Sequence, residues 1–384
     1  MRIFIIFALI LNVLSCKNES IKVRNLIKGD WELIQESSQN YSGFNVPFGI
    51  SFSDDSVEIF NGLFQLYNDS STNRKVVKYK GNFTGYITKG DSIIIKNSFK
   101  GSQDLRWKFI KVNVDTLWIA VNDSMTRKLQ RLKSAINKPD EFDQIIISNW
   151  GCYGSCPAFE LSVNKQGEVL YNGRVYVEKT GSFEGHFDRK EVDFVFSKFN
   201  KANPITLRDE YMVEHTDDKT IVTTFVKDRK IVKTIHDYGG KGTSNLFWAY
   251  IPISNLYINI ALQKVEFKLP FNPNIQLFAF VKDSAYLMIE SSESYFLWTE
   301  LKKGHAVETS FEIKYTIWFN SNYYDSEFIS KGAIETRSNI TSIKSDGRYF
   351  RFEFKKANPI TIDLGYDFVK RNFKDRKLRT KNGQ

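Results

Sequence analysis

Short apolar runs with alternating side chains are the feature of this sequence that most restricts its fold. Between residues 25 and 135 these runs recur at close spacing, at residues 49–52, 57–60, 76–79, 92–95, 107–110 and 116–119. Turn-forming residues separate them, for example at 53–55 and 89–91. Because successive side chains of a strand point to opposite faces, the pattern predicts an antiparallel meander that closes into a barrel or a sandwich.

The first of these strands begins with Gly29, Asp30 and Trp31. Followed by about eight strands, this start resembles the lipocalin-like domains of bacterial lipoproteins. The resemblance implies a lipocalin-like β-barrel over residues 25–135, with an interior just able to hold one small ligand. Trp31 is expected to close one end of such a barrel or to serve as an ordinary core residue.

Residues 141–261 combine strands with two stretches of helical periodicity. Asp188 and Glu191 have the spacing of a helix-capping box. Apolar residues follow them at helical intervals, at Val192, Val195, Phe196 and Phe199. A second stripe covers residues 246–260 and contains Pro252, which kinks or ends a helix because it removes a hydrogen bond. We predict an α+β domain with two helices here, joined to the first domain by a linker at 133–140.

The last region, residues 263–384, is predicted to be a β-rich module. Its apolar runs lie at 276–281, 285–290, 295–301, 311–319 and 349–354. Asp346 and Gly347 stand between two apolar alternations, which indicates a hairpin turn. Residues 370–381 are strongly basic and are expected to be a solvated, fraying tail. The predicted fold class is therefore α+β with mostly antiparallel β structure.

The N-terminus predicts export from the cytoplasm. A positive start at Arg2 and an apolar run at 3–13 make a signal peptide of residues 1–15, because the run is shorter than the about 20 residues that span a bilayer. Ser15 and Cys16 resemble the lipobox of bacterial lipoproteins, which implies diacylation of Cys16. Residues 16–24 would then form a lipidated tether similar to those of Bacteroidota. An ordinary signal peptide with an incidental cysteine is the alternative.

The middle region carries a second resemblance. Its marks are Cys152, Gly154, Cys156 and Pro157, then Gly167 and Tyr171, Asp209 and Tyr211, Thr216 and Asp217, and Tyr238 and Gly239. Together they are similar to the family of domain of unknown function 6438, which occurs in bacterial envelope proteins. The family has no established activity, so the resemblance implies a fold and no chemistry. The expected proline shortly after Asp217 is missing, which leaves the shape of that loop in doubt.

Cys152 and Cys156 are predicted to form a structural disulfide. In an exported protein an isolated nearby pair usually oxidises, and three intervening residues let the Cα atoms approach within about 4.4–6.8 Å. Three alternatives remain open: a redox pair, free thiols, or metal ligands together with two of His186, His215 and His236. The cysteine spacing is not that of thioredoxin, and the histidines are not spaced as in zinc sites.

His215, Asp217 and Asp218 form a candidate site loop. An acid/base or cation-binding cluster is one interpretation of it, and a solvated turn is the other, because carboxylates before a strand often cap turns. No phosphate-binding, nucleophile-elbow or metalloprotease motif occurs in the sequence. We therefore assign no catalytic residue, no metal site and no cofactor.

The charge of the chain favours anionic partners. Its 54 Lys and Arg residues exceed its 44 Asp and Glu residues, for a formal net charge of +10. Because the chain is predicted to be exported, we expect no nucleic-acid partner and consider anionic lipid or acidic polysaccharide instead. We expect an outer-membrane lipoprotein of a bacterial cell envelope, facing the periplasm or the cell surface, that binds a protein, a glycan or a small apolar ligand without catalysis. An envelope hydrolase or thiol oxidoreductase that uses the middle domain is the alternative function.

Overall fold

The computed structural model describes residues 23–38, 47–69, 74–99, 102–134, 141–265, 278–319, 340–376 and 379–380. The chain divides into two compact units. One consists of Met1–Ile136 with Ser244–Asn259, and the other of Asn137–Thr243 with Ile260–Gln384. Most of the regular structure is antiparallel strand, with a small number of helices. The predicted α+β class with mostly antiparallel β structure is confirmed.

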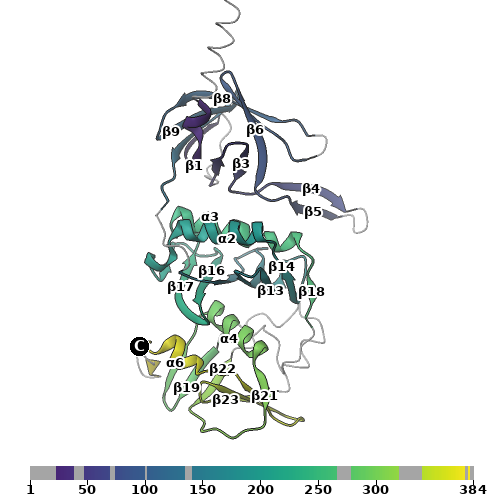
Figure 1. The fold of residues 1–384 in the computed structure, drawn as a ribbon, viewed down its shortest axis with the longest axis vertical. Helices are drawn as coiled ribbons and strands as arrows, with labels where there is room; N and C mark the ends of the chain where they lie inside the picture. The colour runs from purple at the N-terminus through teal and green to yellow at the C-terminus, as the bar shows by residue number, and fades with distance from the viewer. Residues whose placement is uncertain are drawn as a thin grey trace, which may run out of the picture. The chain divides into compact units, whose positions relative to one another are not determined.

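Eight strands of the first unit close into an antiparallel barrel in the order β1-β10-β9-β8-β7-β6-β3-β2 (Figure 1). The strands are β1 Gly29–Ser38, β2 Gly49–Phe52, β3 Ser56–Ile59, β6 Phe83–Lys89, β7 Ser92–Ile95, β8 Leu105–Val112, β9 Thr116–Asn122 and β10 Met125–Arg131. Closure pairs β1 with both β2 and β10, so no barrel strand keeps an unpaired edge. The predicted barrel is confirmed.

Apolar side chains pack together inside this barrel. They include Trp31, Ile50, Ile93, Trp107 and Leu129, all buried. Trp31 is fully buried and donates a hydrogen bond from Nε1 to the carbonyl of Ile27 at 2.6 Å. The guanidinium of Arg131 lies 4.1 Å from its ring centroid. Trp31 is therefore a core residue whose one polar atom is satisfied.

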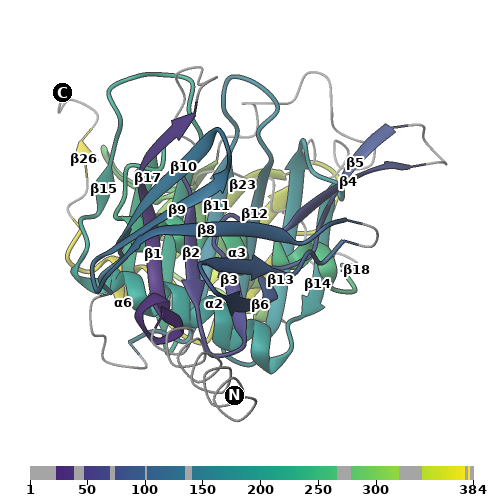
Figure 2. The ribbon, with the colours of Figure 1, turned by 90° about the horizontal axis from the view of Figure 1, so that it is seen from above.

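A two-stranded hairpin extends from the barrel between β3 and β6. It consists of β4 Phe64–Asp69 and β5 Arg74–Tyr79, which pair only with each other. Figure 2 shows it leading away from the barrel strands. The run at 76–79 is thus a strand, as the alternation predicted, but it belongs to this hairpin and not to the barrel.

Helix α3, Ser244–Ile253, groups with the barrel unit, as does the 3₁₀ helix η2, Leu256–Asn259. Trp248 donates from Nε1 to Glu32 Oε1 at 3.2 Å and packs 5.4 Å from the ring of Phe60. Pro252 lies in the last turn of α3, which ends one residue later. The second helical stripe is confirmed as a helix. Its contacts with Glu32 and Phe60 place it in the barrel unit, although it is distant from the barrel in sequence.

The second unit contains two eight-stranded sheets. The first has the order β15-β17-β16-β11-β12-β13-β14-β18, antiparallel except between β15 and β17. Its strands are β11 Gln144–Trp150, β12 Ala158–Asn164, β13 Glu168–Val175, β14 Gly181–His186, β15 Glu210–Tyr211, β16 Thr220–Lys227, β17 Lys230–Tyr238 and β18 Gln263–Lys264. A tight turn at Asp228 and Arg229 joins β16 to β17, and both turn residues have positive φ.

Helix α2, Arg189–Ala202, packs on one face of this sheet, and η1, Pro204–Thr206, follows it. The predicted capping box is present, since Asp188 accepts from the Glu191 amide and Glu191 accepts from the Asp188 amide. The ring of Phe196 stacks on Phe142, and Phe199 packs edge-on against Phe225. The helical stripe thus buries its apolar side against the sheet.

The second sheet of this unit has the order β21-β25-β24-β23-β22-β19-β20-β26. Its strands are β19 Phe278–Lys282, β20 Ala285–Met288, β21 His305–Val307, β22 Tyr315–Phe319, β23 Ile340–Ser345, β24 Tyr349–Phe354, β25 Ile360–Asp363 and β26 Arg379–Thr380. The turn between β23 and β24 contains Gly347 with φ +105°, as the Asp346–Gly347 pair predicted.

The strand predicted at 295–301 is wrong, because these residues lie in helix α4, Ser291–Lys303. Residues 291–301 are buried around the whole circumference of the helix. Because no side of α4 faces solvent, polar residues such as Ser292 and Glu300 are buried together with the apolar ones, and the sequence lacks the amphipathic periodicity that distinguishes helix from strand. Its start is marked by a capping pair of Glu290 and Glu293, which the prediction overlooked.

Helix α4 lies between the two sheets (Figure 1) and contacts β11, β12 and β16. Ile146 and Val226 of the first sheet share one apolar cluster with Phe296, Phe350 and other residues of the C-terminal region. The predicted segments 141–261 and 263–384 each supply most of one sheet, with β18 of the second segment at the edge of the first sheet, and the two sheets share a core within one compact unit.

The predicted fraying tail is partly ordered: Phe373 is buried in this core, whereas Lys370, Arg371 and residues 374–376 are exposed. Residues Phe368–Phe373 form helix α6, and Arg376 pairs with the buried carboxylate of Glu293. The signal peptide, Cys16 and the start of the tether lie outside the described residues. None of the helices in the described ranges is both long and apolar enough to cross a bilayer.

Candidate functional site: the cysteine-loop cluster

The cysteine loop connects β11 to β12. Cys152 and Cys156 are joined by a disulfide, with their Cα atoms 5.5 Å apart. The predicted disulfide is thus present, and both sulfur atoms are bonded to each other. The backbone between them is closed into a small ring, which restricts the conformations of Tyr153, Gly154 and Ser155.

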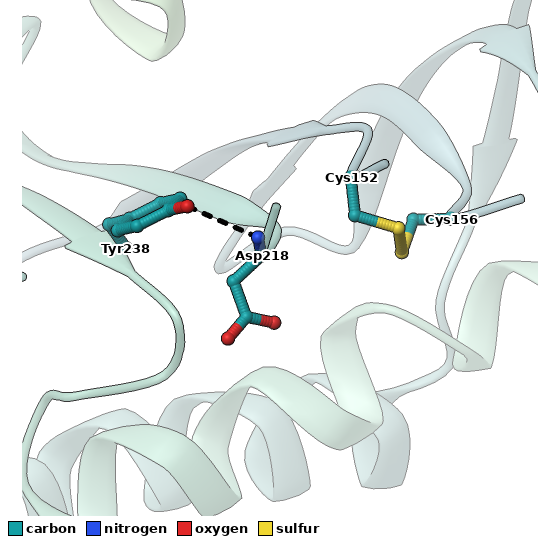
Figure 3. The surroundings of a disulfide bond; sticks show 4 residues. All are labelled: Cys152, Cys156, Asp218 and Tyr238. Carbon is teal, nitrogen blue, oxygen red and sulfur yellow. Dashed lines mark hydrogen bonds between the residues drawn. A yellow bond between two sulfur atoms is a disulfide. The ribbon is translucent and has the colours of Figure 1, made fainter. Parts of the chain in front are cut away.

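The candidate site loop lies directly beside the cysteine loop. The amide of Tyr153 donates to the carbonyl of Asp217 at 3.2 Å. The backbone amide of Asp218, the residue after Asp217, donates to the hydroxyl of Tyr238 at 3.1 Å (Figure 3). His215 Nε2 and Asp218 Oδ2 are 2.7 Å apart. We call residues 151–157, 215–219 and 238–239 the cysteine-loop cluster.

Two backbone positions give this cluster its shape. Asp217 has φ +76°, in the left-handed region that Asp and Asn tolerate better than most residues. Gly239 has φ +73°, and a Cβ there would come within 2.4 Å of Val213. A side chain at 239 would therefore clash as well as strain the backbone, so the turn after β17 requires glycine.

Lys219 of the cluster is partly buried, and Asp237 beside it is fully buried. Burial lowers the pKa of the Lys219 ammonium, while the nearby carboxylates of Asp218 and Asp237 favour its charged form. Burial raises the pKa of Asp237, and amide donors such as Gly242 oppose that rise. The Asp237 carboxylate thus holds the loop after β17 by accepting from the Gly242 amide. His215 and Asp218, in contrast, are substantially exposed, so their contact is a solvent-screened surface pair.

The arrangement provides a rigid surface and little chemistry. His215 and Asp218 form a pair that could move a proton, but Asp217 contributes its backbone carbonyl to the cluster. Both sulfurs are held in the disulfide, so neither is a thiolate nucleophile. His186 ends β14, and His236 lies beside Glu290, with 3.6 Å between Nδ1 and Oε2. Among the residues that the structure describes, no group of His, Cys, Asp or Glu is suited to hold a metal ion.

The residue that sequence reasoning missed is Tyr153. Its side chain is 88% exposed, the highest value among the large apolar side chains that are exposed in the described ranges. The prediction treated the loop only as a source of sulfur chemistry. An aromatic residue between two bonded cysteines was the available signal, because a closed loop has few ways to fold such a side chain inward.

Comparison with known proteins places the cluster in a family segment. Residues 143–257 match the model of a domain of unknown function, DUF6438. Among curated proteins, none matches this sequence. A solved structure of a lipocalin-like protein from Bacteroides uniformis ATCC 8492 is 13% identical, with 28% of this chain and 99% of that chain covered and a TM-score of 0.19. The barrel is established by the pairing of its own strands.

The residues on which the resemblance was based divide between the cluster and the rest of the matched segment. Cys152, Asp217, Tyr238 and Gly239 belong to the cluster, although 87 residues separate the first from the last, whereas Gly167, Tyr171, Asp209 and Tyr211 lie outside it. The absence of a proline after Asp217 has a physical explanation at position 218. Asp218 uses its amide to bond the Tyr238 hydroxyl, and a proline there would have no N–H to donate.

Replacing both cysteines by serine is expected to lower the free energy of unfolding of the second unit by about 2 kcal/mol or less. The closed loop is short, so the disulfide removes little entropy from the unfolded chain. Urea denaturation of the oxidised wild type and the Cys152→Ser/Cys156→Ser variant measures the difference. A loss of folding in the variant would show that the loop has a larger structural role than its length implies.

Proposed function

We propose that this chain is a lipid-anchored cell-envelope protein that binds a protein partner through the cysteine-loop cluster, without catalysis. One observation carries the proposal: Tyr153 projects from a disulfide-closed loop with 88% of its side chain exposed. Apolar surface presented to water in this way has a cost that burial against a partner recovers.

The geometry around Tyr153 favours tight binding. Tyrosine offers a large contact area for the loss of only two side-chain rotations, and it is enriched among residues that dominate interface energies. Its backbone is already held by the disulfide and by the hydrogen bond to Asp217. Binding therefore costs little additional ordering of the loop.

The barrel supports the choice of a protein partner over a small apolar ligand. Two tryptophans, Trp31 and Trp107, and ten other buried apolar side chains form a single cluster inside it. A lipocalin that carries ligands keeps such space for the ligand, whereas here the described side chains occupy the interior. The barrel is better suited to serve as a scaffold.

Membrane attachment belongs to the proposal through Cys16. A diacylated cysteine at the mature N-terminus would hold the chain on the outer membrane, since two acyl chains give stable anchoring. Cells grown with labelled palmitate are expected to label the wild-type chain and not the Cys16→Ser variant. Equal labelling of both, or recovery of the wild type with soluble contents, contradicts the anchor.

Photo-crosslinking in intact cells tests the binding surface. Benzoylphenylalanine placed at Tyr153 of the full chain is expected to give one discrete, protease-sensitive adduct of higher mass. Tyr176 is the matched control, because it is also an exposed tyrosine of the second unit, at 57%, but lies outside the cluster. Once the adduct has identified the partner, Tyr153→Ala should weaken its binding by about 30-fold, as expected for a residue that dominates an interface.

The outcomes separate the candidate partners. An adduct that resists protease but is removed by glycosidases indicates a glycan and overturns the choice of a protein. Equal adducts at 153 and 176, or none at 153, overturn the binding surface itself. The oxidoreductase alternative would need the disulfide to be reduced first, since neither cysteine is a thiolate while they are bonded to each other.

A further inference from the structure

The hairpin β4–β5 presents an apolar face that its own unit does not cover. Strand register places Phe64 opposite Tyr79 and Leu66 opposite Val77, so these four side chains share one face. Tyr79 is buried at the base and packs 5.3 Å from Phe64. Further along, Leu66 is 69% exposed and Val77 is 53% exposed.

Exposure of Leu66 and Val77 to water is unfavourable in free energy unless another surface covers these side chains. An isolated two-stranded hairpin is marginally stable in water, and here Leu66 and Val77 lie near the middle of its two strands. Figures 1 and 2 both show β4 and β5 extending away from the barrel strands. The side chains of Leu66 and Val77 are therefore available to a partner outside the unit.

The charge of the hairpin indicates what that partner is. β5 and the residue after it contain Arg74, Lys75, Lys78 and Lys80, whereas Asp69 is the one acidic residue of β4. Lys78 and Lys80 are exposed. By the same alternation Lys78 lies on the face opposite to Leu66 and Val77, so the hairpin has one apolar face and one basic face. An amphipathic element of this kind matches a surface that is anionic outside and apolar beneath.

We infer that the β4–β5 hairpin inserts into the interface of an anionic lipid bilayer, with Leu66 and Val77 below the headgroups and Lys78 and Lys80 against them. Phe64, which is 42% exposed on the same face, extends the apolar contact, whereas Tyr79 stays buried at the base of the hairpin. The contact is independent of the acyl anchor proposed above and adds a second point of attachment for the same chain.

Vesicle flotation of the chain from residue 16 onward, carrying Cys16→Ser so that no acyl group contributes, tests this inference. The protein is expected to float with vesicles of equimolar phosphatidylcholine and phosphatidylglycerol and to remain below vesicles of phosphatidylcholine alone. Leu66→Ser/Val77→Ser should lower the partition coefficient by at least about tenfold, because the buried apolar area is lost. Lys78→Gln/Lys80→Gln should lower it by about 25-fold, and added salt should reduce this difference.

A matched control comes from the barrel wall. Ile110 and Lys111 on β8 are also exposed, so Ile110→Ser/Lys111→Gln changes the same chemistry outside the hairpin and should leave flotation unchanged. All variants alter exposed side chains, and unchanged circular dichroism melting confirms that they fold. Absence of flotation, or equal losses in hairpin and control variants, overturns the inference. So does a dimer that Leu66→Ser/Val77→Ser dissociates, which would assign the face to a second copy.

Discussion

Arg376→Ala is expected to destabilise the second unit by about 3 kcal/mol, because it leaves the carboxylate of Glu293 buried without its cation. Glu293 lies in the first turn of α4 and is fully buried. Arg376 Nη1 donates to Glu293 Oε2 at 2.8 Å, and Nη2 bonds the other carboxylate oxygen. Two neutral donors remain in the variant, the Thr234 hydroxyl at 2.7 Å and the Glu290 amide at 2.8 Å. They keep the loss at the lower end of the range for broken buried pairs.

Urea denaturation at neutral pH measures this change. Arg371→Ala is the control, because Arg371 also belongs to the C-terminal segment but packs over the exposed side of Tyr366 without a buried carboxylate partner among the contacts described. We expect it to change stability by less than about 0.5 kcal/mol. The double variant Arg376→Met/Glu293→Leu should recover part of the loss, since a buried pair can be replaced by apolar residues of similar size. Recovery is incomplete because the Thr234 hydroxyl and the Glu290 amide lose their acceptor. Loss of stability without recovery would show that Arg376 acts by packing rather than by charge.

The same ion pair shows where sequence reasoning reached its limit. Arg376 lies in a basic stretch that resembles a solvated tail, and Glu293 lies just before an apolar run that resembles a buried strand. The two positions are 83 residues apart in the sequence. The local pattern of apolar and polar residues cannot predict a contact between positions so far apart. A helix buried on all sides also hides the amphipathic pattern that would have identified it.

Features that depend on local patterns were predicted well. The barrel strands follow from alternation because one face of each strand points into the core. The α2 capping box and the Asp346–Gly347 turn follow from hydrogen bonds and φ angles within a few residues. The grouping of α3 with the barrel could not be predicted, because it depends on Trp248 meeting Glu32 and Phe60.

The candidate site also combines local features, which the sequence could predict, with long-range contacts, which it could not. The disulfide is a local feature, and the spacing of Cys152 and Cys156 was sufficient to predict it. The contact between Tyr153 and Asp217 joins two loops through the sheet topology, because β11 and β16 are neighbours in space and distant in sequence. The exposure of Tyr153 could be known only once both loops were in place.

Trp31→Ala is expected to destabilise the barrel by about 3–5 kcal/mol, which makes it the largest single effect in the first unit. Trp31 is fully buried in the barrel cluster, so its removal leaves a cavity that the closed, fully paired strands are poorly able to fill. It also leaves the Ile27 carbonyl without its indole donor and the Arg131 guanidinium without the ring beneath it.

Two comparison variants separate these contributions. Trp31→Phe keeps most of the ring volume and loses the hydrogen bond, so it should cost about 1–3 kcal/mol. Trp118→Ala removes a tryptophan of β9 that is 38% exposed, and we expect a much smaller change because less buried area is lost. Urea denaturation followed by circular dichroism reports each change, and limited proteolysis shows whether cleavage moves to the barrel region. If Trp31→Ala and Trp118→Ala cost the same, the inside of the barrel is not a packed core, and its role as a scaffold would have to be reconsidered in favour of a ligand-holding interior.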